Sequence, residues 1–246
     1  MSLTRLKIAI AILLLIGFLA ACDEARDSRN LMTETRSVAL EGAARAEVGV
    51  NMGAGELNLR GAAQAALLEA SFEFNRERNR PEVNYRMFGD KGILEVRHAR
   101  RRGLNFGPTR NRWDLVLGDS VPLDLKIDLG AGRSEIDLRG LKLERVEIDM
   151  GVGETVLDLR GRPAAGFLVK IDGGVGSGRI TLPSEVGVRV KVDGGLGSVN
   201  AHGLTKQSGA WVNDAYGKSP VTIEVDIDAG IGSLDLICEP SAQIRT

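Results

Sequence analysis

A Gly-X-Gly motif occurs six times and constrains the fold of this chain more than any other feature. Its first glycines are Gly53, Gly130, Gly151, Gly174, Gly195 and Gly230. From Gly130 onward, successive first glycines lie 21, 23, 21 and 35 positions apart. A regular period of this length with one enlarged step is typical of a stacked solenoid in which one coil carries an insertion. The longer interval between Gly53 and Gly130 would hold three to four coils of weaker pattern.

Aliphatic side chains alternate with polar ones on both sides of each motif. Three residues before the first glycine stand Val50, Ile127, Ile148, Ile171, Val192 and Ile227. This alternation predicts two short strands with one buried face, joined by a glycine turn that needs positive φ angles. The alternation slips between Gly140 and Val146, which indicates a corner. We therefore expect each coil to have three sides.

These patterns predict an all-β fold, a single-chain β-helix-like solenoid with coils of about 21-23 residues. The alternative is an antiparallel sandwich of hairpins. The chain has 31 glycines but only 7 prolines and no collagen triplet, which favours many tight turns over disorder.

The N-terminus is typical of a bacterial lipoprotein. Arg5 and Lys7 precede an apolar run at positions 8–20, which is short for a membrane span and typical of a signal peptide. Leu19, Ala20, Ala21 and Cys22 resemble a lipobox, in which the cysteine thiol receives the lipid and acyl chains such as palmitate form the anchor. An uncleaved anchor, or cleavage elsewhere with Cys22 incidental, is the alternative.

The expected organisation has four parts. Residues 1–21 are the signal peptide, 22–37 a polar tether, 38–120 an N-terminal β region and 121–246 the Gly-X-Gly repeats. An anchored protein of this kind would lie on the extracytoplasmic face of the cell membrane. Asp23 resembles the signal for inner-membrane retention in Gram-negative bacteria.

The charge balance argues against nucleic acid as a partner. The chain has 32 basic and 33 acidic residues, and removal of residues 1–21 leaves 30 and 33. The two histidines, His98 and His202, are far apart in sequence, so we expect neither a metal centre nor a cofactor.

Acidic residues recur two positions before the motif. They are Asn51, Asp128, Asp149, Asp172, Asp193 and Asp228, with an amide in the first copy. In a solenoid they would form a column of like charges, which needs compensation. Each carboxylate could accept hydrogen bonds from the N–H groups of its own turn, or the column from Asp128 to Asp228 could bind calcium. A thermal stability unaffected by calcium or a chelator would exclude the second interpretation.

The sequence does not favour catalysis. Solenoid enzymes that act on polysaccharides break their repeat with acidic or basic residues that converge on one bond, whereas here the carboxylates follow the repeat. No nucleophile, metal or phosphate-loop motif is present in the sequence. We therefore predict no catalytic residues.

The least repetitive stretch, residues 97–113, is rich in arginine. Its arginines are Arg97, Arg100, Arg101, Arg102, Arg110 and Arg112. One interpretation is a solvated loop. The other is a contact for anionic headgroups, envelope phosphates or an acidic partner, because the arginine fork matches phosphate oxygens.

The segment from Trp113 (WDLVLGDSVPLDLKIDLGAGRSEIDLRG) through the glycine motifs to IEVDIDAGIGSLDL resembles the bacterial toast-rack domains. These are similar to the C-terminal domain of LiaF-type cell-wall stress-response proteins. The resemblance implies a β-solenoid without catalysis, which in some members regulates an envelope-stress sensor kinase. This chain differs in having Cys22 where LiaF-type proteins have transmembrane helices.

The functional expectation is a membrane-anchored, non-catalytic interaction or sensing module of the cell envelope. Its partners would be the membrane, through the acyl anchor, and an envelope protein or anionic envelope polymer. A structural or adhesive solenoid that associates with itself is the alternative, and a polysaccharide-active enzyme the third. The sequence predicts no oligomeric state.

The arginine cluster yields a first prediction. Replacing Arg100, Arg101 and Arg102 by serine should weaken binding of the protein to anionic lipid vesicles several-fold, because three phosphate-binding side chains are lost. Co-sedimentation with vesicles of graded anionic content measures this. Unchanged binding would support the solvated-loop interpretation.

Overall fold

The computed structural model describes residues 31–76, 79–98 and 110–241, and within them almost every element is a β-strand. None of these residues forms a helix that is long and apolar enough to cross a membrane. The strands are β1 (Met32–Ala39), β2 (Arg45–Ala62), β3 (Ala66–Phe74), β4 (Pro81–Phe88), β5 (Lys91–His98), β6 (Asn111–Gly118), β7 (Leu123–Asp137), β8 (Leu143–Asp158), β9 (Phe167–Asp172), β10 (Val175–Pro183), β11 (Gly187–His202), β12 (Thr205–Gln207), β13 (Ala210–Val212) and β14 (Thr222–Glu239).

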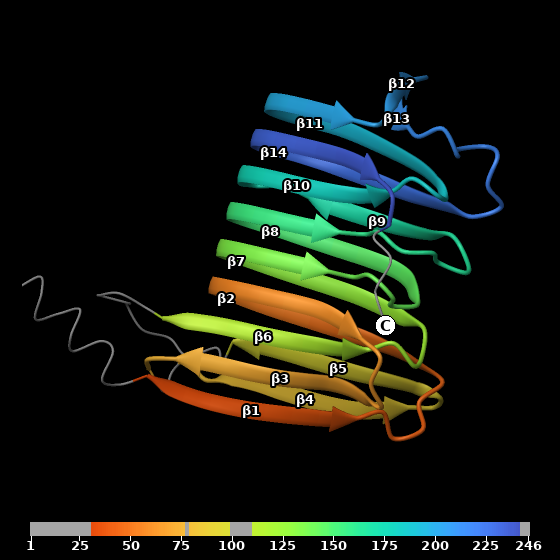
Figure 1. Ribbon diagram of the computed structural model, residues 1–246. Coiled ribbons are helices and arrows are strands. Elements are labelled where there is room, and N and C mark those ends of the chain that lie inside the picture. Colours follow the sequence, from red (N-terminus) through yellow and green to blue (C-terminus); the bar gives the residue numbers. More distant parts are fainter. Residues whose placement is uncertain (1–30, 77–78, 99–109, 242–246) are drawn as a thin grey trace, which may run out of the picture.

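Each coil is a long strand that bends at its glycine motif (Figure 1). We call the part before the motif the first limb and the part after it the second limb. The strands β2, β7, β8, β11 and β14 run through the bend without interruption, whereas β9 and β10 form the two limbs of one coil. The expected turn between two separate strands is therefore a bend within one strand. The expected positive φ occurs mainly at the second glycine, as in Gly153 (φ 145°).

The coils stack in parallel with glycine on glycine. Gly132 pairs with Gly55 on one side and Gly153 on the other, and Gly176 pairs with Gly153 and Gly232. The aliphatic positions of both limbs form one continuous core, which includes Val48, Ile148 and Leu236 among its fully buried members. The predicted all-β solenoid is confirmed.

The spatial order of the coils departs from the chain order. The order is β2, β7, β8, β10, β14, β11, so the last strand of the chain lies between two earlier ones (Figure 1). The expectation that each coil stacks on the next one in sequence is wrong at this end. Residues 203–221 provide a connection long enough for β14 to return to this position.

The position of β14 gives one cross-strand ladder alternating charges. The residues two positions before the acidic column are, in chain order, Lys126, Glu147, Lys170, Lys191 and Asp226. If the coils stacked in that order, Lys170 and Lys191 would be neighbours. In the structure Asp226 pairs with both Lys170 and Lys191. The signs then alternate along the whole ladder, which removes a repulsion between like charges on adjacent strands.

The N-terminal region is arranged differently from the expectation. The first limb of β2 pairs directly with β7, so three to four weak coils do not lie between the first two motifs. The intervening residues instead form β3 to β6 on the other side of β2. The strands β5 and β6 lie parallel to the two limbs of β2, and β4, β3 and β1 continue the sheet in antiparallel pairs.

Two expected boundaries also change. The tether is expected to extend to residue 37, but β1 already begins at Met32 and pairs with β3. Strand β1 shows no clear apolar alternation in the sequence because it is a polar edge strand with few buried side chains. The division at residue 120 separates no domains, since β2 and β7 on either side share one core.

The third side of each coil is a connection and not a strand. Between β7 and β8, residues 138–142 contain no strand, although Leu138 and Leu141 are buried. The phase slip seen in the sequence marks this connection. It returns the chain from the second limb of one coil to the first limb of the next.

The glycines are required by contact between backbones at the bends. A Cβ atom on Gly153 would lie 1.8 Å from the carbonyl oxygen of Gly132, and one on Gly176 would lie 1.8 Å from that of Gly153. A real Cβ atom cannot approach so closely, and the positive φ is also unfavourable for other residues. Gly53, in the terminal bend, is different: the nearest atom to its Cβ would be His98 Nδ1 at 3.8 Å.

This difference gives a matched pair of variants. Gly153→Ala should lower the free energy of unfolding by about 3 kcal/mol or more, because it combines a backbone clash with a strained φ. Gly53→Ala should cost less than about 1 kcal/mol. Urea unfolding followed by circular dichroism measures both. Equal losses would show that backbone contact does not impose the glycine requirement.

Candidate functional site

The bends carry an exposed line of apolar side chains, which we call the apolar ridge. It consists of the middle residues of the six motifs, in spatial order Ala54, Ala131, Val152, Val175, Ile231 and Leu196. The side chains grow from alanine to leucine towards β11. Leu196 is 75% exposed and Val152 is 59% exposed. A row of exposed aliphatic side chains of this kind is suited to contact with another surface.

Charge decreases along the same direction. In the column next to the ridge, Glu56, Arg133 and Glu154 occupy the coils nearest β2. The next three coils carry Ser177, Ser233 and Ser198 in this column. The β11 end of the ridge is therefore apolar and uncharged, whereas the β2 end is flanked by ions such as the Arg133–Glu154 pair (2.9 Å).

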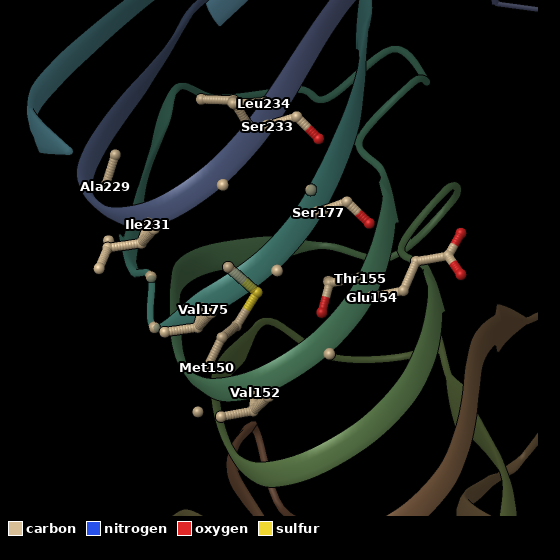
Figure 2. Close-up of a pocket in the computed structure, with 18 of the residues that line it drawn as sticks. Met150, Val152, Glu154, Thr155, Val175, Ser177, Ala229, Ile231, Ser233 and Leu234 are labelled. Atoms are coloured by element: carbon tan, nitrogen blue, oxygen red, sulfur yellow. The ribbon is translucent and has the colours of Figure 1, made fainter. Parts of the chain in front are cut away.

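A pocket of about 120 Å³ opens at the bends of β8, β10 and β14 (Figure 2). The hollow arises because Gly178 stands in register between Thr155 and Leu234 and contributes no side chain. Met150 and Ile231 also line it, so its surface is largely apolar. Thr155 shares a hydrogen bond with Ser134 (2.8 Å). The apolar groups can hold an apolar side chain, and the Arg133–Glu154 ion pair also lines the pocket.

The two limbs of β11 end the stack differently. The first limb is covered by β13, with Arg189 opposite Val212 and Val190 opposite Trp211. The Asn213 side chain completes this cover: it accepts a hydrogen bond from Val188 N–H (3.0 Å) and donates to the carbonyl oxygens of Val186 and Pro183. The segment around Trp211 therefore caps the first limb of β11.

The second limb of β11 forms an open edge, Leu196–His202. Among the residues described, it pairs with β14 on one side and with no strand on the other. Val199, which belongs to the inward-facing column of the second limb, is 39% exposed, since no strand of the described part of the chain covers it. The core is therefore accessible at this half of the end.

Two side chains replace a glycine motif at the other end of the stack. The strands β5 and β6 lie beneath β2 but carry no Gly-X-Gly. The Gly53 N–H donates to His98 Nδ1 (3.0 Å), and Asn111 Nδ2 donates to the Ala54 carbonyl oxygen (2.6 Å). Trp113 Nε1 donates to Asn111 Oδ1 (2.9 Å) and fixes the amide. Side chains thus satisfy the backbone hydrogen-bonding groups of the terminal bend.

His98 is held in its neutral form. Burial lowers the pKa of its imidazole below the ordinary value of 6.5. Nδ1 accepts the Gly53 N–H, so the hydrogen of the neutral ring lies on Nε2, which is 3.1 Å from the amide nitrogen of Asn111. Protonation of Nδ1 would remove the acceptor of the Gly53 N–H. His98 therefore caps the bend, a role that the sequence does not reveal because the residue is solitary there.

The acidic column exists in register, but its carboxylates do not cap their own bends. Asp128 pairs with Asp149, and Asp228 pairs with Asp172 and Asp193. Asn51 Nδ2 donates to Asp128 (2.6 Å), and Lys191 forms an ion pair with Asp193 (2.5 Å). Where the structure is described, these carboxylates accept no hydrogen bond from their own bends, and no three metal-binding side chains gather. Calcium binding stays a prediction.

The other predicted site residues are described only in part. Arg97 forms an ion pair with Glu82, and Arg112 forms ion pairs with Asp114 and Glu56. Arg110 is exposed. Arg100, Arg101, Arg102 and Cys22 lie outside the described residues. The structure therefore engages two of the six arginines with acidic neighbours.

Neither the apolar ridge nor the open edge was expected from the sequence. The ridge has a sequence signal, because every motif has an aliphatic residue between its glycines. The interpretation of the motifs rests on the flanking alternation and not on this position. The open edge has no such signal, since its exposure depends on which coil ends the stack.

Comparison with known proteins gives a family and a fold. The family described as the N-terminal domain of toast_rack, DUF2154, matches residues 27–182. A candidate cell adhesion protein from Clostridium sporogenes ATCC 15579 has a solved structure that is 30% identical, with a TM-score of 0.78, covering 85% of this chain and 100% of that chain. No curated protein matches.

A more distant structure is a candidate adhesin from Bacteroides fragilis NCTC 9343. It is 10% identical, with a TM-score of 0.29, and the alignment covers 86% of this chain and 99% of that chain. This likeness carries no argument about the present chain.

The buried imidazole makes stability depend on pH. Because the pKa of His98 is lowered on folding, its contribution is complete above pH 6.5 and is lost as the pH falls towards the lowered pKa. His98→Gln should reduce this pH dependence and cost about 1 kcal/mol at pH 8. Thermal unfolding between pH 8 and pH 5 measures both effects. The control is exposed His202→Gln; an equal change in both variants would contradict the assignment.

Proposed function

This chain belongs to the toast_rack N-terminal domain family (DUF2154), and we propose that it is a non-catalytic interaction module of the bacterial cell envelope, anchored to the membrane through lipidated Cys22. One observation carries this proposal. The stack has two different ends: β1, which follows residues 1–30, lies at one end, and the uncharged β11 edge lies at the other (Figure 1).

The distance between the ends suits presentation of a surface away from the membrane. From β1 to β11 the sheet path is β1, β3, β6, β2, β7, β8, β10, β14, β11. Eight spacings of about 4.8 Å give a stack of roughly 40 Å. An anchor at Cys22 would hold the β1 end near the headgroups and leave the apolar ridge and open edge of β11 for a partner.

The surface chemistry supports binding over catalysis. Along both limbs, charged side chains pair with their neighbours in the next coil, as in Arg133 with Glu154 and Arg179 with Asp235. The uncharged ridge and edge are left as the distinctive surface. Binding there would be driven by apolar burial and strand pairing and would need no cofactor.

Two roles are compatible with such a module. The first is sensing, in which the distal surface contacts an envelope protein; Asp23 supports retention in the inner membrane if the cell is Gram-negative. The second is adhesion, which is supported by the 30% identical protein from Clostridium sporogenes described as a candidate cell adhesion protein. The arginine cluster of residues 97–113 would add a contact to anionic envelope polymers.

The anchor is tested by Cys22→Ser. This variant should move most of the protein from the membrane fraction to the soluble extracytoplasmic fraction, because the thiol that receives the lipid is lost. Cys238→Ser, which removes the partly buried thiol of β14, is the control and should stay with the membrane. Fractionation and labelling with an alkyne-tagged fatty acid report the result. Label retained in Cys22→Ser would overturn the anchor.

The interaction role is tested in cells with the full-length anchored protein. A photo-crosslinker at Val175 on the apolar ridge should capture a specific envelope protein, with a yield that changes when a cell-wall antibiotic is added. A crosslinker at exposed Lys170, on the opposite limb, is the control. Capture of wall fragments or of the protein itself alone would favour the structural and adhesive role over sensing.

A further inference from the structure

We propose that the open edge of β11, Leu196–His202, pairs with the same edge of a second copy of this chain and joins two stacks at their β11 ends. This proposal specifies the partner in the interaction role above. It rests on that proposed function, which places the membrane anchor at the β1 end. The partner strand would continue the sheet of the second limbs and cover the exposed Val199 side chain.

This edge differs from the other ends of the sheet in its lack of charged residues and proline. The edge strand β1 carries Glu34 and Arg36, and β4 begins with Pro81 and carries Glu82 and Arg86. Charges and proline of this kind prevent unwanted strand pairing. The first limb of β11 is covered by β13. In contrast, residues 194–205 contain no lysine, arginine, aspartate, glutamate or proline.

The edge is also complementary to itself. In an antiparallel pair centred on Val199, the two Val199 side chains face each other, and Ser198 lies opposite Asn200 of the second copy. The hydroxyl can donate to the amide oxygen, because Asn200 uses its Nδ2 to bond Asp235 (3.0 Å). Gly197 lies opposite Ala201, so small residues meet small residues. No like charges oppose each other along the edge, which a second copy requires.

The test uses the full mature lipoprotein, purified in detergent and reconstituted in liposomes, on a Cys238→Ser background. Val199→Cys should form an intermolecular disulfide under mild oxidation, because opposite Cα atoms in such a pair lie about 4.5–5.5 Å apart, within disulfide reach. Exposed Ser177→Cys, in the coil of β10, is the control. We expect at least a fivefold higher yield for Val199→Cys, and equal yields would overturn the proposal.

The register has its own test. A mixture of Ser198→Cys and Asn200→Cys proteins should crosslink several-fold more than either protein alone, because each places its thiol opposite the other. Val199→Lys, without any engineered cysteine, should abolish the self-association seen by sedimentation and leave Tm within a few degrees of the parent. Ser177→Lys should leave self-association intact. Association that survives Val199→Lys would overturn the proposal.

Failure of this proposal is distinguishable from failure of the proposed function. A crosslinker at Val199 that captures a different envelope protein in cells, and never a second copy, would overturn the homotypic pair while the interaction module stands. Conversely, if Cys22→Ser stays in the membrane, the anchor assignment fails, whereas disulfide formation at Val199 still measures the edge pair.

Discussion

Close contact between backbones at the bends is the constraint on which the rest of this structure depends. A Cβ atom at the second glycine of a stacked bend would lie within van der Waals overlap of a carbonyl oxygen of the neighbouring coil, as for Gly132 against Gly55 (1.9 Å) and Gly153 against Gly132 (1.8 Å). Only glycine permits this approach, so every coil must bend at the same place. The aliphatic positions of both limbs then fall in register and form one core.

The same constraint determines where this protein can vary its surface. In bends that stack on a neighbouring glycine motif, two of the three motif positions are restricted to glycine, which leaves the middle residue as the side chain that the bend presents. These residues range from Ala54 near β2 to Leu196 at β11, and the adjacent column changes from ions to serines in the same direction. A uniform scaffold thus acquires a polarity, with a charged, capped β1 end and an apolar β11 end.

The sequence predicted the repeat, the alternation and the acidic register because these are local patterns with a fixed period. It did not predict the position of β14, because all coils carry the same pattern and any two of them could stack. The charges of Lys170, Asp226 and Lys191 alternate only when β14 lies between the other two strands, a pattern that can be recognised only if strand order is allowed to vary. The capping by His98 and Asn111 was equally inaccessible, since these residues meet Gly53 and Ala54 only after β5 and β6 have paired with β2.

The insertion of β14 between β10 and β11 has a consequence for how the chain is made. In solenoids, folding can begin at one coil and spread to its neighbours, but here the coil of β11 has no neighbouring coil until the last strand, Thr222–Glu239, is synthesised. Until then the position between Lys170 and Lys191 is empty. A polypeptide cut short before this strand would leave that position empty and expose core side chains to proteases. The final strand therefore acts as a completeness check on the translated product.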